Sequence, residues 1–240
     1  MKILFQELCL ERIDWDGELQ GNQFKLWKTL LDELKFLSSV RIPRCYFQPN
    51  PVKFELHWFS DTSHRAYAAV VYMHSLYSDG RIDVRLVSSK SRVALLKKQS
   101  IPRLELLGAV LLTRPVNKFN STVEQLKTIN WIDSLTALCW IKNARIWKQF
   151  VQHRGDEIRS LTSPYTWRHC PGDLNPADIP SHGLSERELS TNTTWWNGAS
   201  FLYLPESAWP EMRPTPHESD VVLQEAVKKP TICTCHALAD

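Results

Sequence analysis

The sequence lacks several features that would place the protein outside or across a membrane. No apolar run reaches the roughly 18 residues that a membrane-spanning helix needs. The opening apolar stretch, residues 1–5, is followed at once by Gln6 and Glu7 and is too short for a secretory signal. Six cysteines are present, without the spacing of a disulfide framework. We therefore expect reduced thiols in an intracellular protein without a membrane partner, and leave cytoplasm or nucleus open.

A strong excess of one charge is also missing. The chain has 29 Lys and Arg against 26 Asp and Glu, a formal net charge of +3. This balance permits a nucleic-acid partner without requiring one. With 240 residues, 43% of them hydrophobic, and ten tryptophans, the chain can bury one full core and still supply a small second unit.

The C-terminal tail has few apolar clusters, and it lacks a complete zinc motif. Cys233, Cys235 and His236 are three soft ligands with no fourth at zinc-finger distance, so we interpret them as a chance grouping. Prolines recur through this region at positions 205, 210, 214, 216 and 230. Residues 206–240 are therefore expected to be a linker.

Residues 1–50 are expected to form a helical appendage. Apolar residues recur at helical spacing through residues 24–37, after the helix-start signals Asp14 and Asp16. An extended connector follows, marked by Pro43, Pro49 and Pro51. The amphipathic helix has an apolar face that needs a partner surface.

The central part of the chain predicts an α/β domain. Strands are expected at 54–61, 67–72, 81–88, 127–132 and 166–170, and helices at 101–112, 135–141 and 147–161. The first three strands would pair antiparallel, and the two later ones would follow crossover helices and run parallel. This arrangement is a mixed five-stranded sheet flanked by helices. Pro115 is expected to kink or shorten the first of these helices.

Four acids stand at chemically informative places in this pattern. Asp61 and Asp133 end strands, Glu105 lies in the otherwise apolar run RLELLGAVLL, and Asp178 follows the last strand. Taken singly, each has an ordinary explanation as a turn residue, a helix cap or a solvent-facing acid. Acids that converge on one point would instead need a cation among them.

Basic residues gather in one segment that contains no acid. The segment comprises Lys90, Arg92, Lys97, Lys98 and Arg103, and is called the basic strip below. A solvated loop is the simplest explanation, and a strip that follows the phosphates of a nucleic acid is the functional one.

The order of the acids carries a resemblance. An Asp at the end of a first strand, a Glu in the first long helix, an Asp ending the fourth strand and then His-x5-Asn-x-Ala-Asp resembles the type 1 ribonuclease H pattern. More closely, the strings MKILFQELC, IPRCYF, FSDTSHRAYAAVVY, KSRVALLKK, IPRLELLGA, WRHCPGDLNPADIPSHGLS and WWNG resemble the polymerase-to-ribonuclease H part of BEL/Pao retrotransposon polyproteins. The resemblance spans roughly residues 1–205.

The resemblance implies a fold, a reaction and a site. Residues 1–50 would be the end of a reverse transcriptase, residues 51–205 a ribonuclease H-like domain, and the tail a linker toward an integrase. Two Mg²⁺ or Mn²⁺ ions would be held by Asp61, Glu105, Asp133 and Asp178, with Asp61 bridging both. The substrate would be the RNA strand of an RNA–DNA hybrid. His169 would assist proton transfer or product release, and Ser63, Asn175 and the basic strip would contact the substrate.

Two other functions stay open. His182 stands where the family motif usually has Arg, and Pro115 interrupts a helix usually free of proline, so the chain could be a remnant that binds nucleic acid with little turnover. Asp61-Thr62-Ser63 also resembles the Asp-Thr/Ser-Gly loop of aspartic peptidases, a label given to related elements. That chemistry needs two such loops, and Ser63 replaces the required glycine.

Overall fold

The computed structural model describes residues 1–46, 48–122, 126–143, 145–211 and 219–227. Side chains at 119–122 are outside this description, as are Cys233, Cys235 and His236. None of the helices in the described ranges has both the length and the apolar character needed to cross a membrane.

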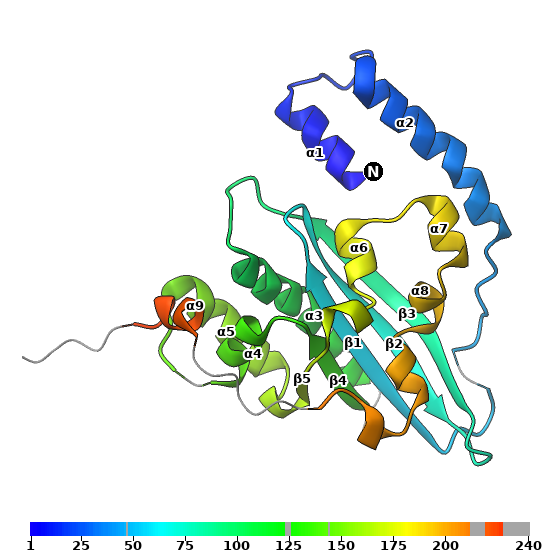
Figure 1. Ribbon diagram of the computed structural model, residues 1–240, viewed down its shortest axis with the longest axis vertical. Coiled ribbons are helices and arrows are strands. Elements are labelled where there is room, and N and C mark those ends of the chain that lie inside the picture. Colours follow the sequence, from blue (N-terminus) through cyan, green and yellow to red (C-terminus); the bar gives the residue numbers. More distant parts are fainter. Residues whose placement is uncertain (47, 123–125, 144, 212–218, 228–240) are drawn as a thin grey trace, which may run out of the picture.

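A mixed five-stranded sheet organises the molecule (Figure 1). Its strands are β1 (Lys53–Thr62), β2 (Ala66–Leu76), β3 (Ile82–Val93), β4 (Lys127–Ile132) and β5 (Trp167–His169). The order across the sheet is β3-β2-β1-β4-β5. β1, β2 and β3 pair antiparallel, and β4 lies parallel to both β1 and β5. The expected sheet of three antiparallel and two parallel strands is confirmed.

Alternating side chains of the strands feed two separate cores. Leu56 and Trp58 of β1 lie in the core under α3 (Ile101–Thr122), α4 (Leu135–Lys142) and α5 (Gln149–Leu161). Phe59, between them and the strand end, joins Trp131 and Phe201 in the core on the opposite face. The opposite face is covered by α6 (Asp178–His182), α7 (Glu186–Thr191), α8 (Thr193–Asn197) and the 3-10 turns η4 (Ser200–Tyr203) and η5 (Glu206–Ala208). Because successive side chains of a strand point to opposite faces of the sheet, a single strand such as β1 contributes to both cores.

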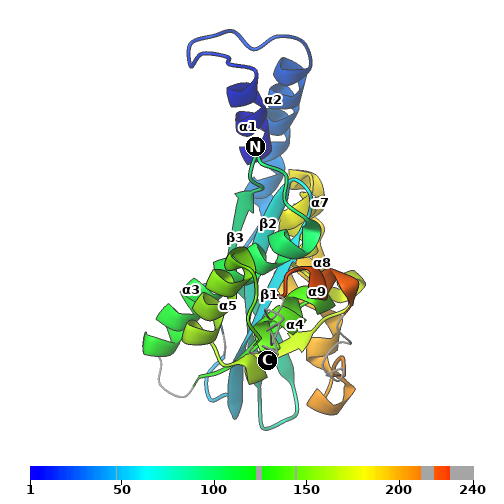
Figure 2. The same cartoon turned by 90° about the vertical axis from the view of Figure 1, so that its left-hand side faces the viewer.

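The N-terminal appendage contains α1 (Lys2–Leu10), α2 (Gly21–Glu33) and the 3-10 turn η1 (Leu34–Ser39). Figures 1 and 2 show α1 and α2 side by side beyond one end of the sheet. α1 is attached through polar contacts: Lys2 Nζ donates to the Ser91 carbonyl at 2.7 Å, and Glu7 pairs with Arg65 at 2.6 Å. Phe5 and Leu10 of α1 are exposed, although Leu4 is buried. Trp15, in the segment between α1 and α2, is 97% exposed.

Four local expectations need correction. β3 runs on to Val93, past the predicted end at residue 88, because Lys90 and Arg92 pair with Ala69 and Tyr67 of β2. Helix α3 continues through Pro115, so the expected shortening is wrong. Asp14 and Asp16, expected to mark a helix start, lie in the irregular segment between α1 and α2, and α2 begins only at Gly21. Helix α1 was not expected from the sequence.

The first part of the expected linker packs on the domain. Trp209 is 5% exposed and belongs to the second core, and Val222 of α9 (Asp220–Gln224) is 1% exposed in the first core. Glu225 forms an ion pair with Arg103 at 2.7 Å. The proposed boundary at residue 205 therefore precedes side chains that complete both cores.

Candidate metal centre

The carboxyl ends of β1 and β4 bring two of the predicted acids together. These strands run parallel with Ser60 opposite Ile132, so the next residues, Asp61 and Asp133, lie side by side at one sheet edge. Open α/β sheets place their ligand crevices at such edges. The third acid, Glu105, comes from the second turn of α3.

Gly108 of α3 packs on the end of β1, one turn after Glu105. A Cβ atom at this position would lie 3.4 Å from the Asp61 carbonyl oxygen and 3.7 Å from Ser60 Cβ. Both are ordinary van der Waals distances, so an alanine would fit here, and only a longer side chain would meet β1.

Asp61, Glu105 and Asp133 form the first of two carboxylate groups, called the inner triad. One oxygen from each lies within 4.8 Å of the others. Asp61 and Glu105 are each 4% exposed. Among the described residues, no donor reaches Glu105 Oε2 or Asp133 Oδ1. Buried carboxylate oxygens normally have a partner, and a bound cation would supply one to these two orphan oxygens.

Electrostatics within the inner triad oppose three negative charges. Burial, with the neighbouring carboxylates of Asp133 and Asp61, raises the pKa of Glu105 to about 10. Burial and Asp61 raise the pKa of Asp133 to about 7. The pKa of Asp61 is also raised by burial, although the Ser181 hydrogen bond works in the other direction. A divalent cation would offset the same repulsion.

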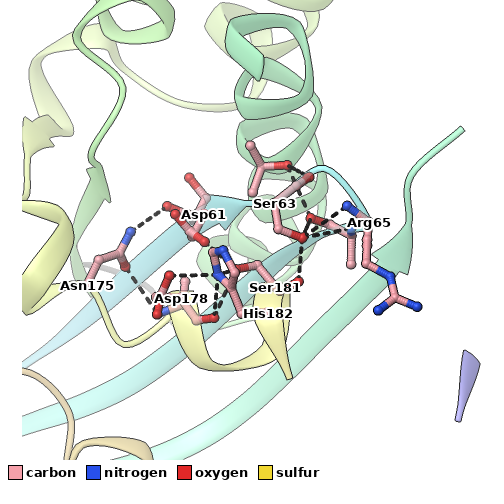
Figure 3. A network of polar contacts seen from close by, with 11 residues as sticks. Asp61, Ser63, Arg65, Asn175, Asp178, Ser181 and His182 are labelled. Atoms are coloured by element: carbon pink, nitrogen blue, oxygen red, sulfur yellow. Dashed lines mark hydrogen bonds and ion pairs between the residues drawn. The ribbon is translucent and has the colours of Figure 1, made fainter. Parts of the chain in front are cut away.

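Asp178 belongs to a second group that also contains Asp61. One ligand atom each of Asp61, Asp178 and His182 lies within 4.8 Å of the others, and this group is called the outer triad. Asp178 and His182 begin and end the short helix α6, and both are exposed. His182 Nδ1 is 2.8 Å from Asp178 Oδ1. Figure 3 shows these side chains gathered around Asp61, which is the single residue common to both triads.

Ser181 links Asp61 to helix α6, and sequence reasoning missed it. Its hydroxyl donates to Asp61 Oδ2 and lies 2.9 Å from the Asp178 carbonyl oxygen. The side chain is buried, at 1% exposed. A single serine in a helix gives no periodic signal; its position three residues after Asp178 is the one clue in the sequence.

Ser63 and Asn175, predicted to contact substrate, are buried and fix the backbone (Figure 3). Ser63 Oγ donates to the Ser181 carbonyl at 2.7 Å and accepts from the Ala66 amide at 3.1 Å. Asn175 Nδ2 donates to the Ser60 carbonyl at 3.0 Å. Both side chains therefore attach the α6 segment to the end of β1. Their role in substrate contact stays a prediction.

His169 lies beside the inner triad at the end of β5. Its Nε2 is 3.1 Å from the Asp133 carbonyl oxygen, and the ring is half-buried. The ring therefore stands next to the backbone that carries a triad acid. This position suits the predicted role in proton transfer, which stays a prediction.

The structure separates the basic strip into two parts. Lys90, Arg92, Lys97 and Lys98 are exposed on β3 and the loop after it. Arg103, in the first turn of α3, instead pairs with Glu225 and lies 4.8 Å over the Phe150 ring. Four of the five predicted phosphate-binding cations thus face solvent, and Arg103 is engaged within the fold.

A third titratable group is buried in the other half of the sheet. Glu55, His57 and His74 offer ligand atoms within 4.8 Å of one another. Trp131 Nε1 donates to His57 Nδ1 at 3.1 Å. Because an indole can only donate, His57 Nδ1 accepts and Nε2 carries the proton. His57 is therefore in the wrong tautomer to bind a metal at the nitrogen that faces Glu55.

The donor set of the two triads fits divalent cations. Mg²⁺ and Mn²⁺ prefer oxygen donors, and the inner triad supplies three carboxylates, two of them with an orphan oxygen. Asp61 could contribute to both positions, as the resemblance implies. The ligand assignment of the four acids stays a prediction.

Comparisons with known proteins identify a family. A family model described as "Pao retrotransposon-like RNaseH-like domain" matches residues 1–134. That range contains the inner triad and ends before His169 and Asp178. No curated protein matches the chain.

Two solved structures are similar at low sequence identity. RNase H1 from the halophilic archaeon Halobacterium salinarum NRC-1 is 12% identical over 50% of this chain and 86% of that chain, with a TM-score of 0.32. The N-terminal RNase H domain of Rv2228c from Mycobacterium tuberculosis, solved as a fusion with maltose-binding protein, is 7% identical over 59% and 99%, with a TM-score of 0.36. Both likenesses are too distant to carry an argument.

Proposed function

Because this chain belongs to the family of Pao retrotransposon-like RNaseH-like domains, we propose that it is a metal-dependent nuclease that cleaves the RNA strand of RNA–DNA hybrids. The observation that carries the proposal is the inner triad, whose buried carboxylates include two oxygens without a donor among the described residues. Asp61, Glu105, Asp133 and Asp178 would hold two Mg²⁺ or Mn²⁺ ions. A pair of ions at such a site activates a water and stabilises the leaving oxygen of a phosphodiester.

The protein's own groups have distinct tasks in this proposal. Asp61 accepts a hydrogen bond from the Ser181 hydroxyl, which holds its carboxylate in one orientation. Glu105 is carried by α3, which packs on β1. His169 stands beside Asp133, where it could carry a proton to or from the reacting strand. Preorganised groups of this kind need no rearrangement when the charge develops.

Substrate binding is assigned to the exposed part of the basic strip. Lys90, Arg92, Lys97 and Lys98 present cations along β3 and the loop that follows it. Such cations bind phosphates without reading the base sequence. The distinction between RNA and DNA would come from 2′-hydroxyl contacts in the wide minor groove of the hybrid.

The rest of the chain fits a larger polyprotein. The family match begins at residue 1, and so includes the segment assigned to the end of a reverse transcriptase. Several apolar side chains of α1 and α2 are exposed, and a reverse transcriptase part packed on them would cover this surface. Reverse transcriptase and integrase parts are accordingly the proposed protein partners.

The deciding experiment uses the full chain and an RNA–DNA hybrid labelled on the RNA strand. We expect cleavage of the RNA strand with Mg²⁺ or Mn²⁺, and none with excess chelator. The D61N variant should lose about a thousandfold in rate, because Asp61 belongs to both triads and would serve both ions. This loss corresponds to about 4 kcal/mol of transition-state stabilisation. D173N, which removes a nearby exposed acid outside both triads, should cleave like the wild type.

Other outcomes would favour the alternatives. A protein that binds the hybrid but leaves it uncut with either metal, with no effect of D61N, would be the nucleic-acid-binding remnant. Proteolysis inhibited by a pepstatin-like compound would identify the aspartic peptidase.

A further inference from the structure

We propose that His182 is a nitrogen ligand of the second metal ion, completing an outer site formed with Asp61 and Asp178. This inference rests on the proposed metal-dependent function. It adds a ligand of a different chemical kind to the four carboxylates, and with it a preference for Mn²⁺ over Mg²⁺.

The geometry of the outer triad carries the first step. His182 Nδ1 lies 2.8 Å from Asp178 Oδ1, and one atom of each triad member lies within 4.8 Å of the others. Ligands at neighbouring corners of an octahedron, each about 2.1 Å from the ion, are themselves about 3 Å apart. The His182–Asp178 pair already has the separation of two ligands on one ion. His182 Nδ1 also lies 3.3 Å from the Asp178 carbonyl oxygen and 3.1 Å from Ser181 Oγ, so it carries the ring proton here. Ligation at Nδ1 would place that proton on Nε2 instead, a tautomer that the exposed ring can adopt.

The neighbouring inner triad supplies an independent sign of an ion at this place. Glu105 is 4% exposed, and its Oε2 has no donor among the described residues. Glu105 belongs to the inner triad, whose Asp61 is also a member of the outer triad. A surface ion pair between His182 and Asp178 would explain their contact, but it would leave the orphan oxygens of the inner triad unexplained.

Helix α6 presents the imidazole on a fixed frame. Ser181 and Asn175 attach α6 to the end of β1, through Asp61 and the Ser60 carbonyl. The imidazole follows directly after Ser181, and Figure 3 shows it on the same side as the Asp178 carboxylate. His182 is exposed, so the ring can turn toward an ion without disturbing the core.

The choice of metal follows from the donor type. Mg²⁺ takes oxygen donors almost exclusively, whereas an imidazole nitrogen increases affinity for Mn²⁺ and later transition metals. A site with one nitrogen and carboxylate oxygens should therefore discriminate in favour of Mn²⁺.

The test is pulsed electron paramagnetic resonance of the full chain with two equivalents of Mn²⁺ and no nucleic acid. A directly bound imidazole gives ¹⁴N modulation in the spin echo. We expect this modulation in the wild type and in H169Q, and its loss in H182Q. Calorimetry should show Mn²⁺ affinity at the weaker site falling by about tenfold or more in H182Q, with Mg²⁺ affinity changing much less.

The results separate this inference from the proposed function. Modulation that persists in H182Q, or is absent from the wild type, would overturn the His182 assignment whether or not hybrid is cleaved. Loss of modulation in H169Q alone would give the nitrogen to the other histidine. Circular dichroism of H182Q should match the wild type, which ensures that a lost signal reports ligation and not unfolding.

Discussion

Ser181 and Ser63 form a short chain of hydroxyl contacts that ends on Asp61. Ser63 donates to the Ser181 carbonyl, and Ser181 donates to Asp61 Oδ2. Both serines are buried, so water cannot replace either contact readily. Residues that orient metal ligands in this way affect a reaction without touching the substrate.

The S181A variant tests this positioning role. We expect kcat for hybrid cleavage to fall by about 10–100-fold with KM little changed, because Asp61 loses the donor that fixes its direction. S181T keeps a hydroxyl and should recover part of the rate. Mn²⁺ affinity, measured by calorimetry, should weaken in parallel with kcat.

A matched control is available on the next helix. Ser190 donates to the Arg187 carbonyl, outside both triads. S190A should retain wild-type kcat and metal affinity. Equal losses in S190A and S181A would mean that helix stability, and not Asp61, accounts for the effect.

At the scale of elements, β1 carries two polar clusters, an acidic one at its carboxyl end and one that contains histidines in its first half. Its carboxyl end bears Asp61, and its first half buries Glu55 and His57, with His74 opposite on β2. Burial, together with His74 and nearby cations, holds the pKa of His57 well below its usual range. Burial also lowers the pKa of His74, although Glu55 opposes this shift. The cations that face the cluster are Lys53, Lys127 and Arg168.

This cluster predicts an acid-sensitive contribution to folding. Since the pKa of His57 is lower in the folded state, the unfolded chain binds the extra proton first as the pH falls below about 6.5. The contribution of His57 to the free energy of unfolding should therefore drop between pH 7 and pH 5. The amide oxygen of Gln in H57Q can still accept from Trp131. The free energy of unfolding of H57Q should fall less than that of the wild type over this range, with a difference of about 2 kcal/mol at most at pH 5.

Urea unfolding of both proteins at several pH values measures the difference. Comparing the variant with the wild type cancels the carboxylates of the metal centre, whose raised pKa values act in the opposite direction. H153Q, at an exposed histidine, should follow the wild-type curve. Parallel curves for H57Q and the wild type would contradict the prediction.

Sequence patterns predicted elements more reliably than their ends. Alternation and turn residues located all five strands, and strand ends pointed to Asp61 and Asp133. Lys90 and Arg92 were expected in a loop because charged residues are uncommon in strands. Their pairing with β2 depends on the neighbouring strand and is not visible in the local sequence. Ser181 was missed because its role comes from contact with Asp61, 120 positions away in sequence. Local patterns contain no record of such long-range contacts.

At the scale of the whole molecule, neither hydrophobic core contains a described residue from the segment 1–50. Leu4 is the buried apolar residue of that segment, and the links to the sheet are exposed polar contacts. Exposed ion pairs contribute little to stability. The domain should therefore fold without the appendage.

Two truncations test where the domain ends. The chain cut to residues 51–227 should unfold in one cooperative calorimetric transition, within a few degrees of the main transition of the full chain. The chain cut to 51–205 loses Trp209 and Val222, and its melting temperature should fall by roughly 10 °C, since each lost kcal/mol lowers it by about 2–4 °C. Equal stability of the two truncated chains would place the boundary at residue 205.

The contacts that close the site span long stretches of sequence. Asn175 reaches back 115 residues to Ser60, and Ser181 reaches back 120 residues to Asp61. A ribosome must therefore have released nearly the entire domain before these two links can form. At roughly 5–20 residues per second, the growing chain carries Asp61 for several seconds before Ser181, which orients it, is made. The chain therefore emerges beside its own messenger RNA with the site still unassembled.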